Sequence, residues 1–255
     1  MSTHNAPLTD GGTGSKVLPR HRAASGPALH QRLRAGYVRR PVAVAGVLFG
    51  GLAVLRICGA FSQELMVASI VLTPVLLFVA PRSVWPDIGV RRINSAMNLV
   101  HGVAVVIAAY AIVLVACLVA FGTGPDNWIL GIKVLFMNMA GGSTVLAILV
   151  AVVCMGVLVP VAEEVCFRGV LHHAARSRLT VASAVVGTSA VWAAVHLGDY
   201  GLNPFNGLVI VGVLPSVFVM GLALGWCRVI TDSVAGSTVA QGVANLILVA
   251  WVFTN

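Results

Sequence analysis

Long apolar runs, separated by short polar segments, fill most of the chain after residue 40. A helix needs roughly 20 apolar residues to cross a bilayer, at a rise of about 1.5 Å per residue. Runs of about this length predict seven transmembrane helices: 41–61, 65–81, 98–121, 144–173, 181–197, 206–227 and 236–254. A further stretch, 128–140, is short for a span and predicts a short or re-entrant helix, so that eight spans is the alternative.

The first 40 residues have a different composition. They are rich in Ser, Thr, Gly, Pro and Ala, and they contain seven basic residues: Lys16, Arg20, Arg22, Arg32, Arg34, Arg39 and Arg40. Such a segment buries too little apolar surface to fold alone, and its charge suits anionic lipid headgroups. We therefore expect a basic, mostly disordered cytoplasmic arm over 1–40 and a helical membrane domain over 41–255.

The composition agrees with a membrane protein. Hydrophobic residues make up 58% of the chain and charged residues 9%, whereas an ordinary soluble domain carries about 25% charged residues. The five cysteines are an odd number and lie in apolar stretches, which excludes a disulfide scaffold. The sequence predicts an all-α polytopic membrane protein.

Positive charges indicate how the helices are oriented. Arg82, Arg91 and Arg92 fall between the second and third spans, and Arg176 and Arg178 between the fourth and fifth. Because cytoplasmic loops collect Lys and Arg, this alternation favours seven spans with a cytoplasmic N-terminus. We expect a multi-pass plasma-membrane protein.

One cation, Arg56, falls inside the first apolar run. A charged side chain within the bilayer needs a partner or a path to the interface. We expect Arg56 to snorkel or to pair with Glu64.

Two adjacent acids, Glu163 and Glu164, lie in the fourth run. Neighbouring helix residues point about 100° apart, so the two carboxylates face different directions. Glu164 and Arg168 are spaced i,i+4 and predict an ion pair, which leaves Glu163 for other work, such as general base catalysis. Pro160 predicts a helix distortion just before the pair. The alternative is a solvated cluster at the membrane surface.

His196 lies late in the next run, four residues after Trp192. The two runs form a hairpin that turns near Ser177–Thr180, and Glu163 and His196 are both roughly 23–26 Å from that turn along their helices. We therefore expect them at similar depth, although a packing histidine is the alternative.

Gln241 and Asn245 are spaced i,i+4 on the last run, which places both amides on one helix face at comparable depth. Interhelical hydrogen bonding is the alternative role for these side chains. Gly221 and Gly225, on the run before, predict close helix packing.

Together these segments resemble one family. The motifs are Glu163-Glu164-x-x-x-Arg168, Trp192-x-x-x-His196, Phe218-x-x-Gly221-x-x-x-Gly225 and Gln241-x-x-x-Asn245. Their order and spacing over 144–250 are similar to the CPBP (Abi) family, the CAAX-processing and bacteriocin-processing intramembrane endopeptidases. The family has His where this chain has Gln241.

The resemblance implies hydrolysis of a peptide bond in or beside the membrane. Glu163 would activate water with the help of His196, while Gln241 and Asn245 would stabilise the oxyanion and Glu164 and Arg168 would support the helix. A metal mechanism has also been considered for the family, but Gln is a poor zinc ligand and a good hydrogen-bond donor. We therefore expect no zinc and no other cofactor.

Two other function classes stay open. Gln241 suits a catalytically inactive scaffold or regulatory partner in envelope processes, and a Glu/His pair in a membrane suits a transporter with a proton relay. As partners we expect membrane lipids and a peptide or protein substrate, with no nucleic acid. The family resemblance implies prenylated proteins, bacteriocin leaders or anti-sigma factors as substrates, and the oligomeric state is open.

Overall fold

A computed structural model describes residues 28–255, except for six side chains between positions 63 and 76. The described chain is helical and contains no β-strand. Its α-helices are α1 (Leu29–Arg39), α2 (Pro41–Cys58), α3 (Gln63–Leu72), α4 (Ala96–Phe121), α5 (Trp128–Met139), α6 (Thr144–Val153), α7 (Val159–Glu163), α8 (His172–Arg176), α9 (Val181–Val195), α10 (Gly207–Thr231) and α11 (Val234–Thr254). The predicted all-α fold is confirmed.

Short non-α turns connect several of these helices. π-helical turns at Cys154–Leu158 and Glu164–Leu171 join α6, α7 and α8 into one continuous rod. The 3-10 helices are Gly59–Phe61, Thr73–Val79, Arg82–Val84 and His196–Gly198.

Six helical segments among the described residues are long and apolar enough to cross a membrane: 41–61, 96–121, 144–176, 181–198, 207–231 and 234–254. α5 is the shorter apolar helix that the stretch 128–140 predicts. With α5 included, the number of apolar helices is about seven, as expected.

The expected second span, 65–81, is built differently. It consists of α3 followed by the 3-10 helix Thr73–Val79, in which Pro74 is at one of the first two positions. Proline has no N–H to continue the α-helical hydrogen bonds, so the run does not form a single long helix.

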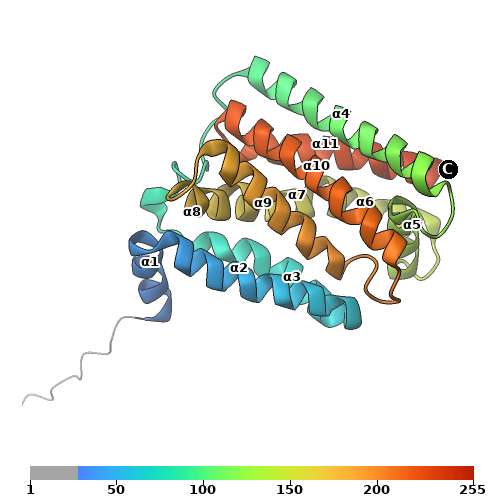
Figure 1. Cartoon of the computed structure of the whole chain (residues 1–255), viewed down its shortest axis with the longest axis horizontal. Coiled ribbons are helices and arrows are strands. Elements are labelled where there is room, and N and C mark those ends of the chain that lie inside the picture. Colours follow the sequence, from blue (N-terminus) through green and yellow to red (C-terminus); the bar gives the residue numbers. More distant parts are fainter. Residues whose placement is uncertain (1–27) are drawn as a thin grey trace, which may run out of the picture.

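The helices lie in successive layers (Figure 1). α4 forms one edge, α10 and α11 lie beside it, α9 and the 144–176 rod follow, and α2 with α3 form the opposite edge. α10 packs against α4, α9 and α11, and α11 also packs against the π-helical turn before α7. The part of the rod from Glu164 onward contacts both α11 and α2.

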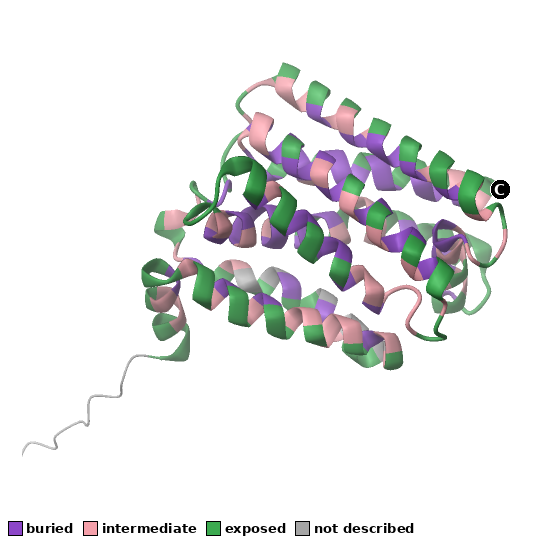
Figure 2. Ribbon diagram, viewed as in Figure 1, coloured by how far each residue is buried: buried purple, intermediate pink, exposed green. Residues whose placement is uncertain are grey.

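Many exposed residues are large and apolar, whereas several buried residues are polar or charged; Figure 2 shows which parts of each helix are exposed and which are buried. Val47 and Val119, on outward faces, are 76% and 83% exposed, whereas Glu163, Glu164 and Arg168 are buried. Such a surface suits hydrocarbon, and buried polar groups in such a protein mark functional or structural contacts. The chain is an integral, multi-pass membrane protein.

The described part of the basic arm, residues 28–40, contains α1 and is therefore helical rather than disordered. Tyr37 anchors it, because its buried hydroxyl donates a 3.0 Å hydrogen bond to the carbonyl of Val170. Burial raises the pKa of this phenol. The expectation for residues 1–27 lies outside the described residues.

Glycines on α10 allow close packing, as predicted. A Cβ atom added at Gly221 would lie 2.9 Å from Cβ of Ser189, and one added at Gly225 would lie 2.6 Å from Cγ1 of Val185. Only glycine lets α10 approach α9 at these two positions.

Candidate active site

The 144–176 rod departs from α geometry beside Pro160. In the π-helical turn the carbonyl of Met155 would accept a hydrogen bond from residue 160, but proline has no N–H. Asn245 Nδ2 donates to this carbonyl instead, over 2.9 Å. The distortion predicted at Pro160 thus ties the rod to α11.

Two glycines bring α11 close to this turn. A Cβ atom at Gly242 would lie 2.5 Å from the carbonyl oxygen of Gly156, and one at Gly156 would lie 2.9 Å from Cδ2 of Leu246. This close approach places Gln241 and Asn245 against the rod, where Gln241 donates to the Glu163 carboxylate and Asn245 to a backbone carbonyl.

The adjacent carboxylates face different surroundings, as expected. Glu164 Oε1 lies 2.9 Å from Arg168 Nη1, and both side chains are fully buried. Arg168 also donates from Nη2 to the carbonyl of Gly221 over 3.2 Å, and its guanidinium lies 4.4 Å from the Trp192 ring centroid. This ion pair is sealed inside the protein and has no access to a substrate.

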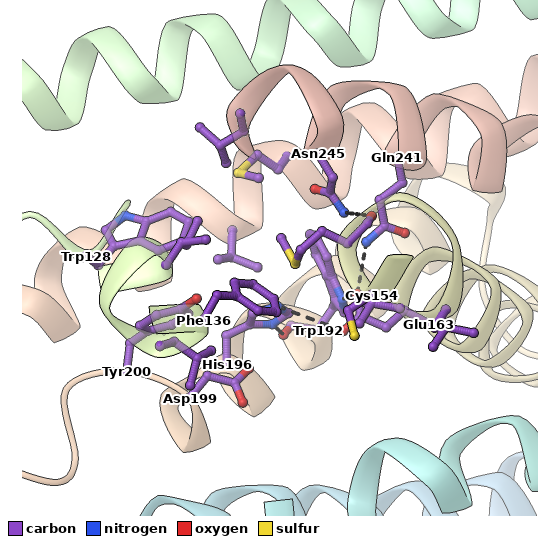
Figure 3. A pocket seen from close by; sticks show the side chains of 18 of the residues that line it. Trp128, Phe136, Cys154, Glu163, Trp192, His196, Asp199, Tyr200, Gln241 and Asn245 are labelled. Atoms are coloured by element: carbon purple, nitrogen blue, oxygen red, sulfur yellow. Dashed lines mark hydrogen bonds and ion pairs between the residues drawn. The ribbon is translucent and has the colours of Figure 1, made fainter. Parts of the chain in front are cut away.

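Glu163 points into a cavity, and its two oxygens differ (Figure 3). Oε2 accepts hydrogen bonds from Trp192 Nε1 at 3.0 Å and from Gln241 Nε2 at 2.9 Å. Oε1 lies 4.0 Å from His196 Nε2 and 3.9 Å from Arg56 Nη2. Oε1 therefore keeps its lone pairs for a further ligand.

His196 is oriented by the end of α9. Its Nδ1 lies 2.8 Å from the carbonyl oxygen of Trp192. A carbonyl can only accept, so Nδ1 carries a hydrogen, and Nε2 is the ring nitrogen that faces Glu163. Glu163 and His196 therefore lie at similar depth, as predicted, and their side chains meet between the rod and the end of α9.

Arg56 has a partner that the sequence analysis missed. It does not pair with Glu64, whose carboxylate accepts a 2.6 Å hydrogen bond from Ser62. Instead Nε and Nη2 of Arg56 contact the two carboxylate oxygens of Asp199, at 3.0 and 2.8 Å. The partners are 143 residues apart in the sequence, and the one available sign was that Asp199 follows the His196 motif closely.

The polar groups around Glu163, but not the sealed ion pair, line a cavity of about 190 Å³ (Figure 3). Glu163, His196, Gln241 and Asn245, the four predicted catalytic residues, are among its lining residues, together with Arg56 and Asp199. The rest of the wall is mainly apolar and comes from α4, α5, α10 and the rod, with Tyr110, Phe136, Met155 and Val217 as examples.

Zinc does not fit these residues well. Within 28–255, no three His, Cys, Asp or Glu side chains are grouped as a metal site would require. Glu163 and His196 would provide two ligands, and the neighbouring position holds Gln241, whose amide is a poor ligand.

Comparison with known proteins supports the resemblance. Residues 143–247 match the family described as type II CAAX prenyl endopeptidase Rce1-like, which confirms the similarity to the CPBP proteases over this region. No curated protein and no solved structure is significantly similar to the chain. The matched region contains every predicted catalytic residue, but neither Arg56 nor α4.

Proposed function

We propose that this protein is an intramembrane endopeptidase that hydrolyses a peptide bond of a membrane-associated protein or peptide through a water activated by Glu163. The match to CAAX-type endopeptidases supports the reaction class. The observation that carries the mechanism is the pairing of Glu163 Oε1 with His196 Nε2 across 4.0 Å at the cavity wall. A water molecule that bonds to both atoms would lie at the apex of a triangle, facing the cavity.

In this mechanism Glu163 takes a proton from that water, and the hydroxide attacks the carbonyl carbon of the scissile bond. His196 orients the water, and the charge moves to the carbonyl oxygen. The Gln241 amide donates one N–H to Glu163, and the Asn245 amide donates one N–H to the carbonyl of Met155. Each retains a second N–H, which would stabilise the oxyanion. Glu163 then returns its proton to the leaving amine, and the C–N bond breaks.

The cavity favours an apolar substrate segment. Its wall is mainly aliphatic and aromatic, with the polar groups gathered around Glu163 (Figure 3). Few, well-placed polar groups in an apolar pocket fix orientation while the wall binds the bulk of a ligand. A lipid-embedded or lipid-modified peptide matches this pocket better than a hydrophilic one.

A direct test uses the purified protein in liposomes with two fluorogenic peptides, one farnesylated at a C-terminal CAAX sequence and one spanning the bilayer unmodified. The wild type is expected to cleave at least one of them. Glu163→Ala is expected to remove this activity while the protein keeps the wild-type elution volume and melting temperature. Undiminished cleavage by Glu163→Ala would rule out the glutamate mechanism.

A second candidate function is an inactive membrane scaffold, and Gln241 is the observation that favours it. Its Nε2 is already engaged with Glu163, and a neutral amide cannot carry the positive charge that an imidazole can. Gln241→His discriminates between the two functions. Activity that appears only in this variant supports the scaffold, whereas cleavage by the wild type supports the protease.

A further inference from the structure

A charged side chain from outside the matched region reaches the candidate active site. Arg56 lies on α2, and its side chain is 11% exposed although it sits in an apolar helix. A guanidinium in such a place is costly unless it is paired. Its two carboxylate neighbours, Asp199 and Glu163, line the same cavity as Arg56.

The pairing with Asp199 fixes the guanidinium. Two parallel contacts, from Nε and Nη2 to the two oxygens, form the bidentate arrangement that restricts an arginine most strongly. A second contact holds the same segments together, because a Cβ atom at Gly198 would overlap the carbonyl oxygen of Arg56. The turn that follows His196 is therefore docked onto α2 at Arg56.

With the guanidinium held in this way, its charge lies beside Glu163 without a direct hydrogen bond. Nη2 is 3.9 Å from Oε1, the carboxylate oxygen that faces His196. Burial disfavours a carboxylate, whereas a positive charge at about 4 Å favours it. From this position Arg56 stabilises the negative charge on Oε1 and leaves the lone pairs of Oε1 free.

We propose that Arg56, held by Asp199, is a positioning residue that stabilises the carboxylate form of Glu163 and keeps Oε1 directed into the cavity. The contribution of Arg56 to catalysis rests on the proposed protease function. The effect of Arg56 on the charge of Glu163 does not rest on it, since that effect follows from charge and distance alone.

Other groups near Glu163 do not replace this charge. The titratable and charged groups around it are Tyr110 on α4, His196, Asp199 and Tyr200 at the end of α9, and Glu164, Cys166 and Arg168 on the rod. Arg168 is engaged with Glu164 at 2.9 Å. Among the described residues, Arg56 is the arginine whose guanidinium lies within 4 Å of Glu163.

The test measures the protonation of Glu163 without any substrate. Dicyclohexylcarbodiimide adds to protonated carboxyl groups in apolar surroundings, and mass spectrometry of the detergent-solubilised full chain locates the adduct. The labelling of Glu163 is followed from pH 5 to 9 in the wild type, Arg56→Gln, Arg56→Lys and Asp199→Asn. Glu164, on the same peptide, serves as the internal control.

In Arg56→Gln we expect the labelling midpoint at Glu163 to move to higher pH, by about one to three pH units. Arg56→Lys keeps the charge and is expected to restore the midpoint. Asp199→Asn removes a neighbouring negative charge and frees Arg56 for Glu163, so its midpoint is expected to move to lower pH. A merely structural role would not produce shifts of opposite sign.

An unchanged midpoint in both Arg56→Gln and Asp199→Asn would overturn the proposal. Asp199→Asn retains the guanidinium in the protein, so it gives a result even where Arg56→Gln does not fold. If the wild type cleaves no peptide, the proposed function fails while the labelling still decides the role of Arg56. If the wild type cleaves a peptide, the acid limb of the pH–rate profile should move to higher pH in Arg56→Gln and to lower pH in Asp199→Asn.

Discussion

Glu163 and Glu164 are neighbours in the sequence, yet they occupy opposite kinds of environment. Glu164 is fully buried against Arg168, at 2.9 Å, in a contact closed to the cavity. Glu163 is buried as well, but one of its oxygens is bound by Trp192 and Gln241 while the other faces the cavity. Burial alone therefore does not distinguish a structural carboxylate from a reactive one; the difference lies in which lone pairs are already used.

The difference follows from helix geometry and from the neighbouring helices. Successive residues on the rod point about 100° apart, so one carboxylate turns toward Arg168 and the other toward α9 and α11. Trp192 contributes to both sides, because its N–H binds Glu163 and its ring faces the Arg168 guanidinium. The sealed ion pair thus supports the indole that orients the carboxylate facing the cavity.

Apart from substitutions of Glu163, we expect the largest effect from breaking the buried ion pair of Glu164 and Arg168. Glu164→Gln leaves the Arg168 charge buried without its partner, which should lower the free energy of unfolding by about 3–5 kcal/mol. Denaturant titration of the protein in micelles measures this loss. The double variant Glu164→Gln/Arg168→Met should recover part of it, and equal stability of all three proteins would contradict a buried ion pair.

A smaller effect, on the cleavage rate, is expected from Trp192→Phe on the side that faces the cavity. This variant removes one N–H donor to Glu163 Oε2 and keeps an aromatic ring beside Arg168. A hydrogen bond to a charged group contributes about 1.5–3 kcal/mol, so cleavage should slow by about 10- to 100-fold while the melting temperature changes little. If Trp192→Phe cleaved at the wild-type rate, the indole would not orient Glu163.

The smallest effect that we expect is a difference in stability between alanine substitutions at two glycines. A Cβ atom at Gly242 would press on the Gly156 carbonyl, so Gly242→Ala should displace α11 and cost about 1–3 kcal/mol of stability. Gly187, within α9, has nothing within 4 Å of an added Cβ atom. Gly187→Ala is the matched control and should stabilise the protein by up to about 1 kcal/mol. Equal melting temperatures for the two variants would contradict the close approach of α11.

Local spacing predicted much of this comparison. The i,i+4 relation of Glu164 and Arg168 fixes their ion pair, and equal distances from one turn bring His196 level with Glu163. These inferences hold because a helix converts sequence separation directly into direction and depth. Gln241 and Asn245 were predicted as site residues from their i,i+4 spacing together with the family motif.

Contacts between helices that are distant in the sequence could not be predicted. Arg56 meets Asp199 across 143 residues, and no periodic pattern encodes which helix lies beside α2. The engagement of Gln241 with Glu163 and of Asn245 with Met155 likewise depends on the approach of α11. The break after α3 is a local feature, since Pro74 is visible in the sequence, but hydrophobicity alone favoured one continuous span.

The division of labour between the two carboxylates is tested most directly by measuring cleavage and thermal unfolding side by side for Glu163→Gln and Glu164→Gln in the same liposomes. We expect Glu163→Gln to lower the cleavage rate by about 10²- to 10⁴-fold with its melting temperature unchanged, as the loss of a general base predicts. We expect Glu164→Gln to melt at a lower temperature while its folded fraction still cleaves. The reverse pattern, with cleavage retained in Glu163→Gln and lost in fully folded Glu164→Gln, would contradict the assignment of Glu163 as the reactive carboxylate.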